Sequence, residues 1–209
     1  MYLIDRTIQF TRGFLLSYGP TPVKKMFWDR EYDSGKWNFA ADSSSDCVYE
    51  FLNQYAAGKT VLDMGCGQGN TANEMALGYK KYVGLDISDE CLNKARKRSA
   101  AEGRGGINSF DQGDFLSYVP RQQFDVILFR ESMYHVPVSK IKPMLDRLAK
   151  YLAPNGVFIV RLYYVGDDKK TLKRRPLAMF DVMEQEFELL QKKNYEAVGS
   201  RVIVFRPKK

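Results

Sequence analysis

The chain has a single histidine and three cysteines among its 209 residues, and it contains no long hydrophobic run. One histidine is too few for a histidine-built metal centre, and Cys47, Cys66 and Cys91 form no paired motif, so we expect no metal site. The odd cysteine count favours a reduced, cytoplasmic protein. No apolar segment approaches the roughly 20 residues of a membrane span, and Phe14-Leu15-Leu16 is too short for the core of a signal peptide. We therefore expect no membrane partner.

Basic residues, by contrast, are plentiful, and the formal net charge is +7. Part of this charge is concentrated in the run Lys169-Lys170-Thr171-Leu172-Lys173-Arg174-Arg175. Such a run attracts nucleic acid or anionic substrates, although a solvated surface is the simpler interpretation. No alternation of arginine with aromatic residues accompanies the run, which argues against a stacking platform for single strands.

The segment from Lys59 to Asn70 predicts a buried strand that runs into a glycine-rich turn and opens a helix. Gly65, Gly67 and Gly69 are each separated by one residue, and glycine there permits a sharp turn and close approach of a ligand. A dinucleotide fingerprint requires the spacing G-x-G-x-x-G, whereas here the third glycine comes one residue early. Asp63 precedes the turn, and its carboxylate would repel a pyrophosphate but suits a positively charged ligand.

Strand-like and helix-like segments alternate after this turn. Further strands are predicted at 81–86, 107–113, 124–129 and 157–162, and helices at 70–77, 88–101 and about 144–152. Such alternation implies a parallel sheet with helices on both faces. Segments 187–195 and 201–205 lie too close in sequence for a helical crossover, so they should pair antiparallel. We predict a single α/β domain over 1–209, with a doubly wound, mainly parallel seven-stranded sheet that ends in an antiparallel hairpin.

The pattern D-x-G-x-G-x-G at Asp63 to Gly69 resembles the first motif of class I S-adenosylmethionine (SAM) methyltransferases. Their ligand carries an ammonium, a sulfonium and two ribose hydroxyls, but no phosphate. A parallel sheet finished by an antiparallel hairpin is typical of the same family, and the resemblance covers roughly 59–207. It implies methyl transfer with SAM as cofactor and S-adenosylhomocysteine (SAH) as product. For the glycines alone, an ordinary turn without a ligand is the alternative.

The resemblance also implies which residues bind SAM, because ligands of doubly wound folds bind at the carboxyl ends of the strands. The methionine part would be held by the first strand end, namely by Asp63, Gly65, Cys66, Gly67 and Gly69.

The next two strand ends would bind the nucleoside. Asp86, followed by Ile87, would accept hydrogen bonds from both ribose hydroxyls. Gly113-Asp114-Phe115 resembles the adenine motif, in which Asp114 accepts from the exocyclic amine and Phe115 covers the ring. A simple helix cap at Asp86 and a simple turn at Asp114 are the alternatives.

The fourth strand is followed by Arg130 to Val136, where the methyl donor should meet its acceptor. Methyl transfer from a sulfonium is an in-line displacement that needs alignment and exclusion of water. Tyr134-His135 matches the aromatic-histidine pair of many family members, and an ordinary histidine pKa of about 6.5 suits a general base. A structural histidine is the alternative. Arg130 could neutralise a carboxylate of SAM or of the substrate, and Glu131 could orient an amine.

Residues 1–40 are predicted to form a lid or cap on a core of 41–209. A short helix is expected at Ile8 to Leu16, and the segment Phe27 to Phe39 is dense in aromatic and charged residues. Tyr32, Lys36 and Trp37 are candidates to close the cofactor pocket, and Trp37 is included among the cofactor-binding residues. Plain packing of these aromatics on the sheet is the alternative.

Two classes of acceptor remain open. The first is a small molecule methylated at oxygen or nitrogen, and the second is RNA or protein docked through 169–175. The segment after the fourth strand lacks the N-P-P-Y or D-P-P-Y of methyltransferases acting on base amino groups. A non-catalytic binding module would have lost the glycine turn or the ribose carboxylate, and both are present. An NAD-dependent oxidoreductase would need the other glycine spacing.

Overall fold

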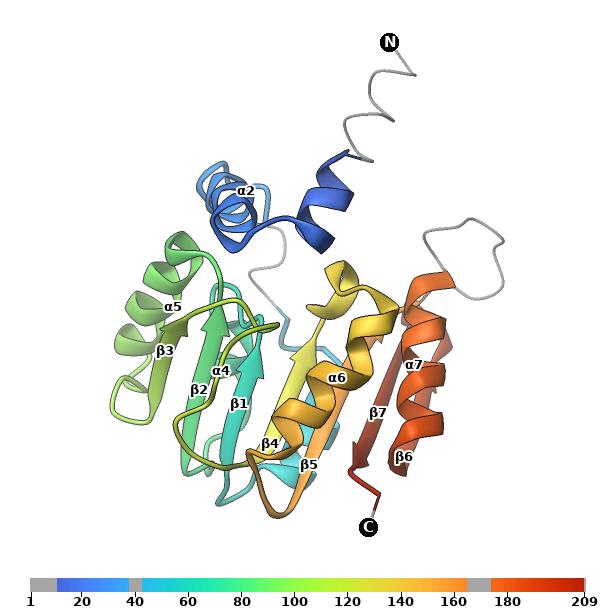
Figure 1. Ribbon diagram of the computed structural model, residues 1–209. Coiled ribbons are helices and arrows are strands. Elements are labelled where there is room, and N and C mark those ends of the chain that lie inside the picture. The colour runs from blue at the N-terminus through green and yellow to red at the C-terminus, as the bar shows by residue number, and fades with distance from the viewer. Residues whose placement is uncertain (1–10, 38–42, 165–173, 209) are drawn as a thin grey trace.

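The computed structural model describes residues 11–37, 43–164 and 174–208, and its centre is one seven-stranded sheet (Figure 1). The strand order is β3-β2-β1-β4-β5-β7-β6, in which β7 runs antiparallel to both of its neighbours. The strands are β1 Thr60–Met64, β2 Lys81–Asp86, β3 Asn108–Gln112, β4 Phe124–Arg130, β5 Leu152–Tyr163, β6 Glu188–Tyr195 and β7 Ser200–Arg206. The predicted fold class, including the antiparallel hairpin at the end, is confirmed.

Helices cover both faces of the sheet (Figure 1). They are α2 Thr21–Asp33, α3 Val48–Tyr55, α4 Asn70–Glu74, α5 Asp89–Ala101, α6 Val138–Ala149 and α7 Arg174–Glu186, with the short 3-10 helices η2 Met133–His135 and η3 Glu196–Val198. Residues 11–18 are also helical. No helix in the described ranges is long and apolar enough to cross a bilayer.

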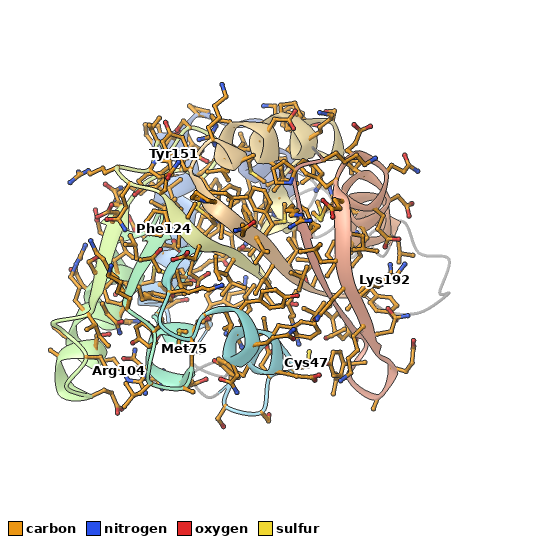
Figure 2. The ribbon with its side chains drawn as sticks, turned by 90° about the horizontal axis from the view of Figure 1, so that it is seen from below. Cys47, Met75, Arg104, Phe124, Tyr151 and Lys192 are labelled. Carbon is orange, nitrogen blue, oxygen red and sulfur yellow. The ribbon has the colours of Figure 1, made fainter. Side chains whose placement is uncertain are left out.

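The hydrophobic core has two layers because side chains alternate across each strand. In β4, Val126 and Leu128 belong to the layer under α3, α4 and α5, whereas Ile127 and Phe129 belong to the layer under α6 and α7. Seen from below, side chains fill the space on both sides of the sheet (Figure 2). Burial on both faces explains why this strand reads as an almost unbroken apolar run.

The helix after β2 begins where its sequence predicts. The Ser88 side chain accepts a hydrogen bond from the Cys91 backbone N–H at 3.4 Å, and Asp89 and Glu90 occupy the positive first turn. This capping fixes the direction in which the chain leaves the end of β2, which is the edge where the site lies.

Three element boundaries differ from the prediction. Helix α4 ends at Glu74 because Met75 adopts an extended conformation. Strand β5 already begins at Leu152, which pairs with Phe124, so the predicted helix end at 152 is wrong. The Pro154-Asn155-Gly156 segment lies inside β5 as an irregularity between Leu152 and Val157, with Asn155 at a φ of 64°. Helices α2, α3 and α7 were not predicted.

The N-terminal part lies across the carboxyl ends of the parallel strands (Figure 1). Pro20 and Pro22 flank the start of α2, where a missing backbone N–H is tolerated. The predicted helix at Ile8 to Leu16 corresponds to helical residues from 11 onward, and 8–10 lie outside the described residues. Of the aromatic segment Phe27 to Phe39, the part to Asp33 belongs to α2 and the last two residues lie outside the described ranges.

Candidate active site

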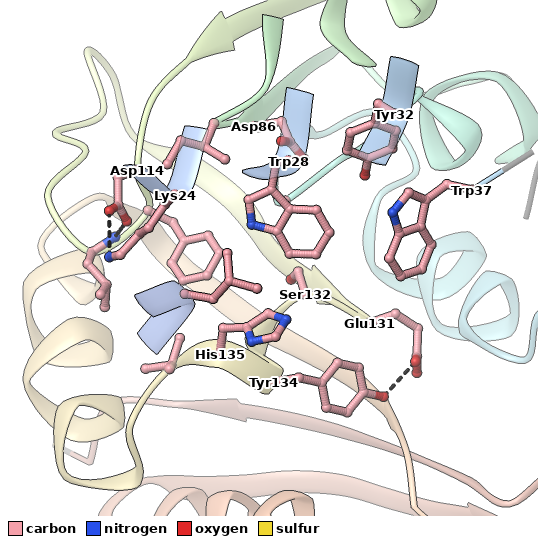
Figure 3. A pocket seen from close by; sticks show the side chains of 16 residues that line it. Lys24, Trp28, Tyr32, Trp37, Asp86, Asp114, Glu131, Ser132, Tyr134 and His135 are labelled. Carbon is pink, nitrogen blue, oxygen red and sulfur yellow. Dashed lines mark hydrogen bonds and ion pairs between the residues drawn. The ribbon is translucent and has the colours of Figure 1, made fainter. Parts of the chain in front are cut away.

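A cavity of about 280 Å³ lies between α2 and the carboxyl ends of the parallel strands. Its wall contains Gly65 from the turn after β1, Asp86 from β2, Asp114 from the loop after β3, and Ser132 and His135 from the segment after β4. Figure 3 shows the side chains of Asp86, Asp114, Ser132 and His135 around the cavity, together with Trp28 and Tyr32 of α2. Parallel strands bring their carboxyl ends to one edge, so residues distant in sequence meet here.

The three glycines of the turn all have left-handed φ angles, which are 86° at Gly65, 54° at Gly67 and 76° at Gly69. A Cβ on Gly65 would lie 2.5 Å from the Cβ of Ser132, and one on Gly69 would lie 2.9 Å from the Cβ of Ala95. A Cβ on Gly67 would meet the Tyr32 hydroxyl oxygen at 3.0 Å. Glycine is therefore required here both for backbone conformation and for space.

Asp86 ties the glycine turn to the start of α5. Its two carboxylate oxygens accept hydrogen bonds from the backbone N–H groups of Gly67 and Ser88, each at 3.0 Å. Burial raises its pKa, while these backbone donors oppose the rise. An ionised carboxylate offers about four acceptor positions, so capacity for two ligand hydroxyls remains. Ile87, the next residue, also lines the cavity.

Asp114 is already engaged by side chains of α2 (Figure 3). One of its oxygens accepts from Lys24 Nζ at 3.0 Å and from Thr21 Oγ1 at 3.2 Å, and the other accepts from the Leu116 backbone N–H at 2.9 Å. Phe115 lies in the cavity wall, where its ring meets Phe129 edge-on at 6.4 Å. The roles of Lys24 and Thr21 were not predicted, because no local pattern links them to a residue 90 positions away.

Aromatic rings from α2 and the residues after it form the roof of the site. The Trp28 ring centroid lies 5.5 Å from that of His135 and 5.8 Å from that of Trp37, and Tyr32 lies 6.3 Å from Trp37. Tyr32 and Trp37 line the cavity as expected, and Trp28 joins them although it was not singled out. Lys36 instead pairs with Glu31 at 3.0 Å on the outer side.

His135 is partly buried in η2 and faces the cavity. Burial lowers its pKa to about 4, and the nearby positive charges of Arg12 and Arg175 act in the same direction. The ring is therefore neutral at physiological pH, and it is a weaker base than an ordinary histidine.

A second, more polar cavity of about 680 Å³ adjoins the first and shares Tyr32, Trp37, Gly65 and Glu131 with it. Cys66, Gly67 and two arginines of adjacent strands also line it. The arginines are held by one carboxylate, since Arg130 Nε lies 2.9 Å and Arg161 Nε 3.3 Å from the oxygens of Asp46. Asp46 and Arg161 were not predicted as site residues.

Asp63 lies behind the glycine turn, outside the walls of these two cavities. It is 1% exposed, and one oxygen accepts from the Tyr82 hydroxyl at 2.6 Å. The other oxygen has no hydrogen-bond partner among the described residues. Burial raises the pKa of Asp63 to about 6. Gly69 also contributes to the packing of the turn against α5 rather than to the wall of either cavity.

Glu131 stands at the junction of the two cavities with a left-handed φ of 55°. Such a conformation is uncommon for a residue other than glycine and often marks a functional site. Its carboxylate pairs with Arg161, accepts from the Tyr163 backbone N–H at 2.6 Å, and accepts from the Tyr134 hydroxyl at 2.5 Å (Figure 3). These partners hold the segment after β4 against the end of β5.

A family model described as a methyltransferase domain matches residues 56–199. The chain belongs to this family, and its predicted membership in the class I SAM-dependent methyltransferases is confirmed. A fatty-acid O-methyltransferase of Mycolicibacterium smegmatis is 30% identical over 154 residues, which cover 69% of this chain and 54% of that protein. A sterol 24-C-methyltransferase of Yarrowia lipolytica is 31% identical over 113 residues, which cover 53% of this chain and 29% of that protein. The chain thus spans about half or less of the length of these relatives.

Solved structures share the fold at lower sequence identity. The N-methyltransferase NodS from Bradyrhizobium japonicum, in complex with SAH, superposes with a TM-score of 0.68 at 16% identity, covering 88% of this chain and 98% of that one. Magnesium protoporphyrin IX methyltransferase from Synechocystis, with bound SAM, gives 0.65 at 16% identity, covering 89% and 96% of the two chains.

Proposed function

We propose that the protein is an enzyme that transfers the methyl group of SAM to an oxygen or nitrogen of a small-molecule acceptor and releases SAH. One observation carries this proposal. The left-handed glycine turn after β1 and the Asp86 carboxylate at the end of β2 border one cavity beneath α2. Residues 1–40 would act as a lid on a core of 41–209.

The residues present fit SAM. A Cβ at Gly67 would fill the space beneath Tyr32, so the bare turn is suited to a ligand that passes close to the backbone. Asp86 and Ile87 would hold the ribose, and Asp114 with Phe115 would hold the adenine. The methionine head group, a zwitterion, would lie in the polar cavity with Arg130 and the turn. When bound, SAM supplies a methyl group on a positively charged sulfur.

The chain's own contribution would be alignment and exclusion of water. Trp28 and Trp37 cover the site, and Glu131 fixes the segment after β4 through Tyr134. His135 remains the candidate base. Because its pKa is about 4, it would remove a proton from an alcohol only weakly, which favours an acceptor that needs little activation.

A small acceptor is supported by the contact that the structure gives for Arg175, at the end of the basic run. Of the basic run 169–175, the structure describes only the last two residues, and Arg175 contacts the segment beside His135. Similar proteins are named as a fatty-acid O-methyltransferase and as an N-methyltransferase, which supports an oxygen or a nitrogen atom as the methyl acceptor.

Calorimetric titration tests the proposal. SAM and SAH should bind to the wild-type protein, whereas NAD should not, because the spacing of the third glycine departs from the dinucleotide fingerprint. Binding of NAD without any response to SAM or SAH would overturn the assignment.

A further inference from the structure

We propose that the acceptor is an apolar molecule with a carboxylate, that Arg175 binds this carboxylate, and that one of its oxygens receives the methyl group. The proposal rests on the proposed function and specifies its acceptor.

Arg175 lies partly buried at the start of α7, and its Nη1 donates to the Tyr134 carbonyl at 3.0 Å. Tyr134 and His135 line the cavity, and the positive charge of Arg175 contributes to the lowered pKa of His135, so the guanidinium lies beside this part of the wall. One contact leaves most of its five N–H donors for a ligand, and the planar guanidinium suits a carboxylate.

The other cations around the cavity are neutralised by carboxylates. Lys24 pairs with Asp114, Arg12 pairs with Glu31, and Arg161 pairs with Glu131. Arg175, by contrast, forms no ion pair within the described part of the chain. Its positive charge near His135 is therefore available to an anion.

The first turn of α7 supplies an independent observation. It contains Arg174 and Arg175 and no acidic residue. The N-terminus of a helix carries partial positive charge, so cations there are unfavourable and anions are favourable. The cationic side chain of Arg175 at this position costs stability in the free protein, and a bound carboxylate would offset that cost.

The remainder of the cavity suits an apolar body. Its wall between the lid and η2 includes Leu16, Phe115, Leu116 and Val136, and Trp28 covers it. On the same helical segment as Leu16, the rings of Phe14 and Tyr18 lie tilted to each other at a centroid distance of 5.2 Å, and each residue is 55% exposed. An apolar chain leaving the cavity would pass over these rings.

Carboxylate methylation also agrees with the lack of a strong base. A carboxylic acid with a pKa of about 4 is ionised at neutral pH. One carboxylate oxygen forms the new bond to the methyl carbon, the bond from that carbon to sulfur breaks, and its electron pair stays on sulfur. The negative carboxylate and the positive sulfonium become a neutral ester and a neutral thioether, and no proton moves.

The test compares decanoate, 1-decanol and decylamine as acceptors with labelled SAM. We expect methyl decanoate as the product, with kcat/KM for decanoate at least about tenfold above that for either analogue. Arg175→Gln should raise KM for decanoate about tenfold or more, because a charge-assisted hydrogen bond is lost, with a smaller effect on kcat and none on SAM affinity. Arg175→Lys should restore part of the loss.

Arg121→Gln is the matched control, because it removes one exposed charge ahead of β4, at the opposite edge of the sheet, and should leave KM unchanged. Preferred methylation of the alcohol or the amine, or an unchanged KM in a folded Arg175→Gln protein, would overturn the proposal. SAM binding measured in the same proteins separates this outcome from failure of the proposed function, in which SAM itself would not bind.

Discussion

Asp86 illustrates how one side chain can serve both the fold and the ligand. Its oxygens accept hydrogen bonds from the backbone N–H groups of Gly67 in the glycine turn and of Ser88 just before α5. The side chain therefore joins the carboxyl ends of β1 and β2. A structural role of Asp86 at the start of α5 and a role in ribose binding are therefore compatible. Only a measurement of ligand binding can show whether the second role exists.

We expect Asp86→Ala to weaken SAH binding by about tenfold or more, since each hydrogen bond to a carboxylate contributes roughly 1.5–3 kcal/mol before water compensates. Calorimetry with SAH and its 2′,3′-dideoxy analogue makes the test specific. The wild type should prefer SAH, and the variant should not discriminate. Ser88→Ala, which removes the side-chain cap of α5 and keeps the carboxylate, should retain the preference. Discrimination that persists in Asp86→Ala would assign Asp86 to the fold alone.

Asp63 and His135 should act on stability in opposite directions between pH 4 and 6. The folded-state pKa of Asp63 is about 6, against an ordinary value of 3.8, so the native state keeps this proton to higher pH than the unfolded state does. The contribution of Asp63 to the unfolding free energy therefore falls as pH rises. The folded-state pKa of His135 is about 4 against an ordinary 6.5, so its contribution rises with pH and is lost on acidification. Each shift corresponds to roughly 3 kcal/mol, and the two contributions largely cancel.

Single variants should reveal each contribution in urea unfolding of the ligand-free protein from pH 4 to 6.5. Asp63→Asn removes the contribution of Asp63, which falls with pH. The unfolding free energy of this variant should therefore rise with pH more steeply than that of the wild type. His135→Gln should show the reverse. Three parallel pH curves would contradict both assignments.

At the scale of elements, α2 is attached to the core mainly by polar contacts. Ser88 Oγ donates to Asp29 at 2.7 Å, Lys94 Nζ donates to the Tyr32 carbonyl at 2.7 Å, and Lys25 pairs with Asp89 at 3.1 Å. The partly exposed Lys25–Asp89 pair contributes about 0–1 kcal/mol, and the Lys24–Asp114 pair adds a buried polar contact between α2 and the loop after β3. An element held in this way can open without unfolding the sheet.

Binding of SAM should therefore slow amide hydrogen exchange in α2, because ligand contacts with Trp28 and Tyr32 add to these weak ties. Helix α6, which packs on the other core layer, serves as the internal reference and should not change. Both tryptophans of the chain line the cavity, so intrinsic fluorescence should respond in the same titration. Equal protection of α2 with and without SAM would favour plain packing over a lid.

The strands and helices that are specified by residues within their own segment could be predicted from the sequence. Apolar runs mark β1, β2 and β4, and Ser88 with two acidic residues marks the start of α5. The start of β5 at Leu152 was not predictable, because it depends on pairing with Phe124 on another strand. The Lys24–Asp114 pair and the Arg175–Tyr134 contact likewise depend on tertiary packing, so the sequence indicates which strand ends border the cavity better than it indicates the contacts made by α2 and α7.

At the scale of the whole molecule, the net charge of +7 raises the question of a nucleic-acid substrate. Lys169, Lys170 and Lys173 belong to the basic run but lie outside the described residues. Arg175 differs from the predicted solvated surface, since it is partly buried against Tyr134. The lysines and Arg175 should therefore behave differently when replaced.

We expect the triple change Lys169→Ser, Lys170→Ser and Lys173→Ser to leave turnover of a small acceptor within about twofold, because under the small-acceptor proposal these lysines act on the site only through charge effects that salt screens. Arg175→Gln alone should raise the acceptor KM. If RNA were the substrate, its affinity would instead fall steeply with salt, with a slope of about 0.7 per phosphate contacted on a single strand. Fluorescence anisotropy of a labelled RNA, recorded between about 50 and 200 mM salt, measures this slope. A steep slope that the triple change abolishes would replace the small-molecule acceptor with RNA.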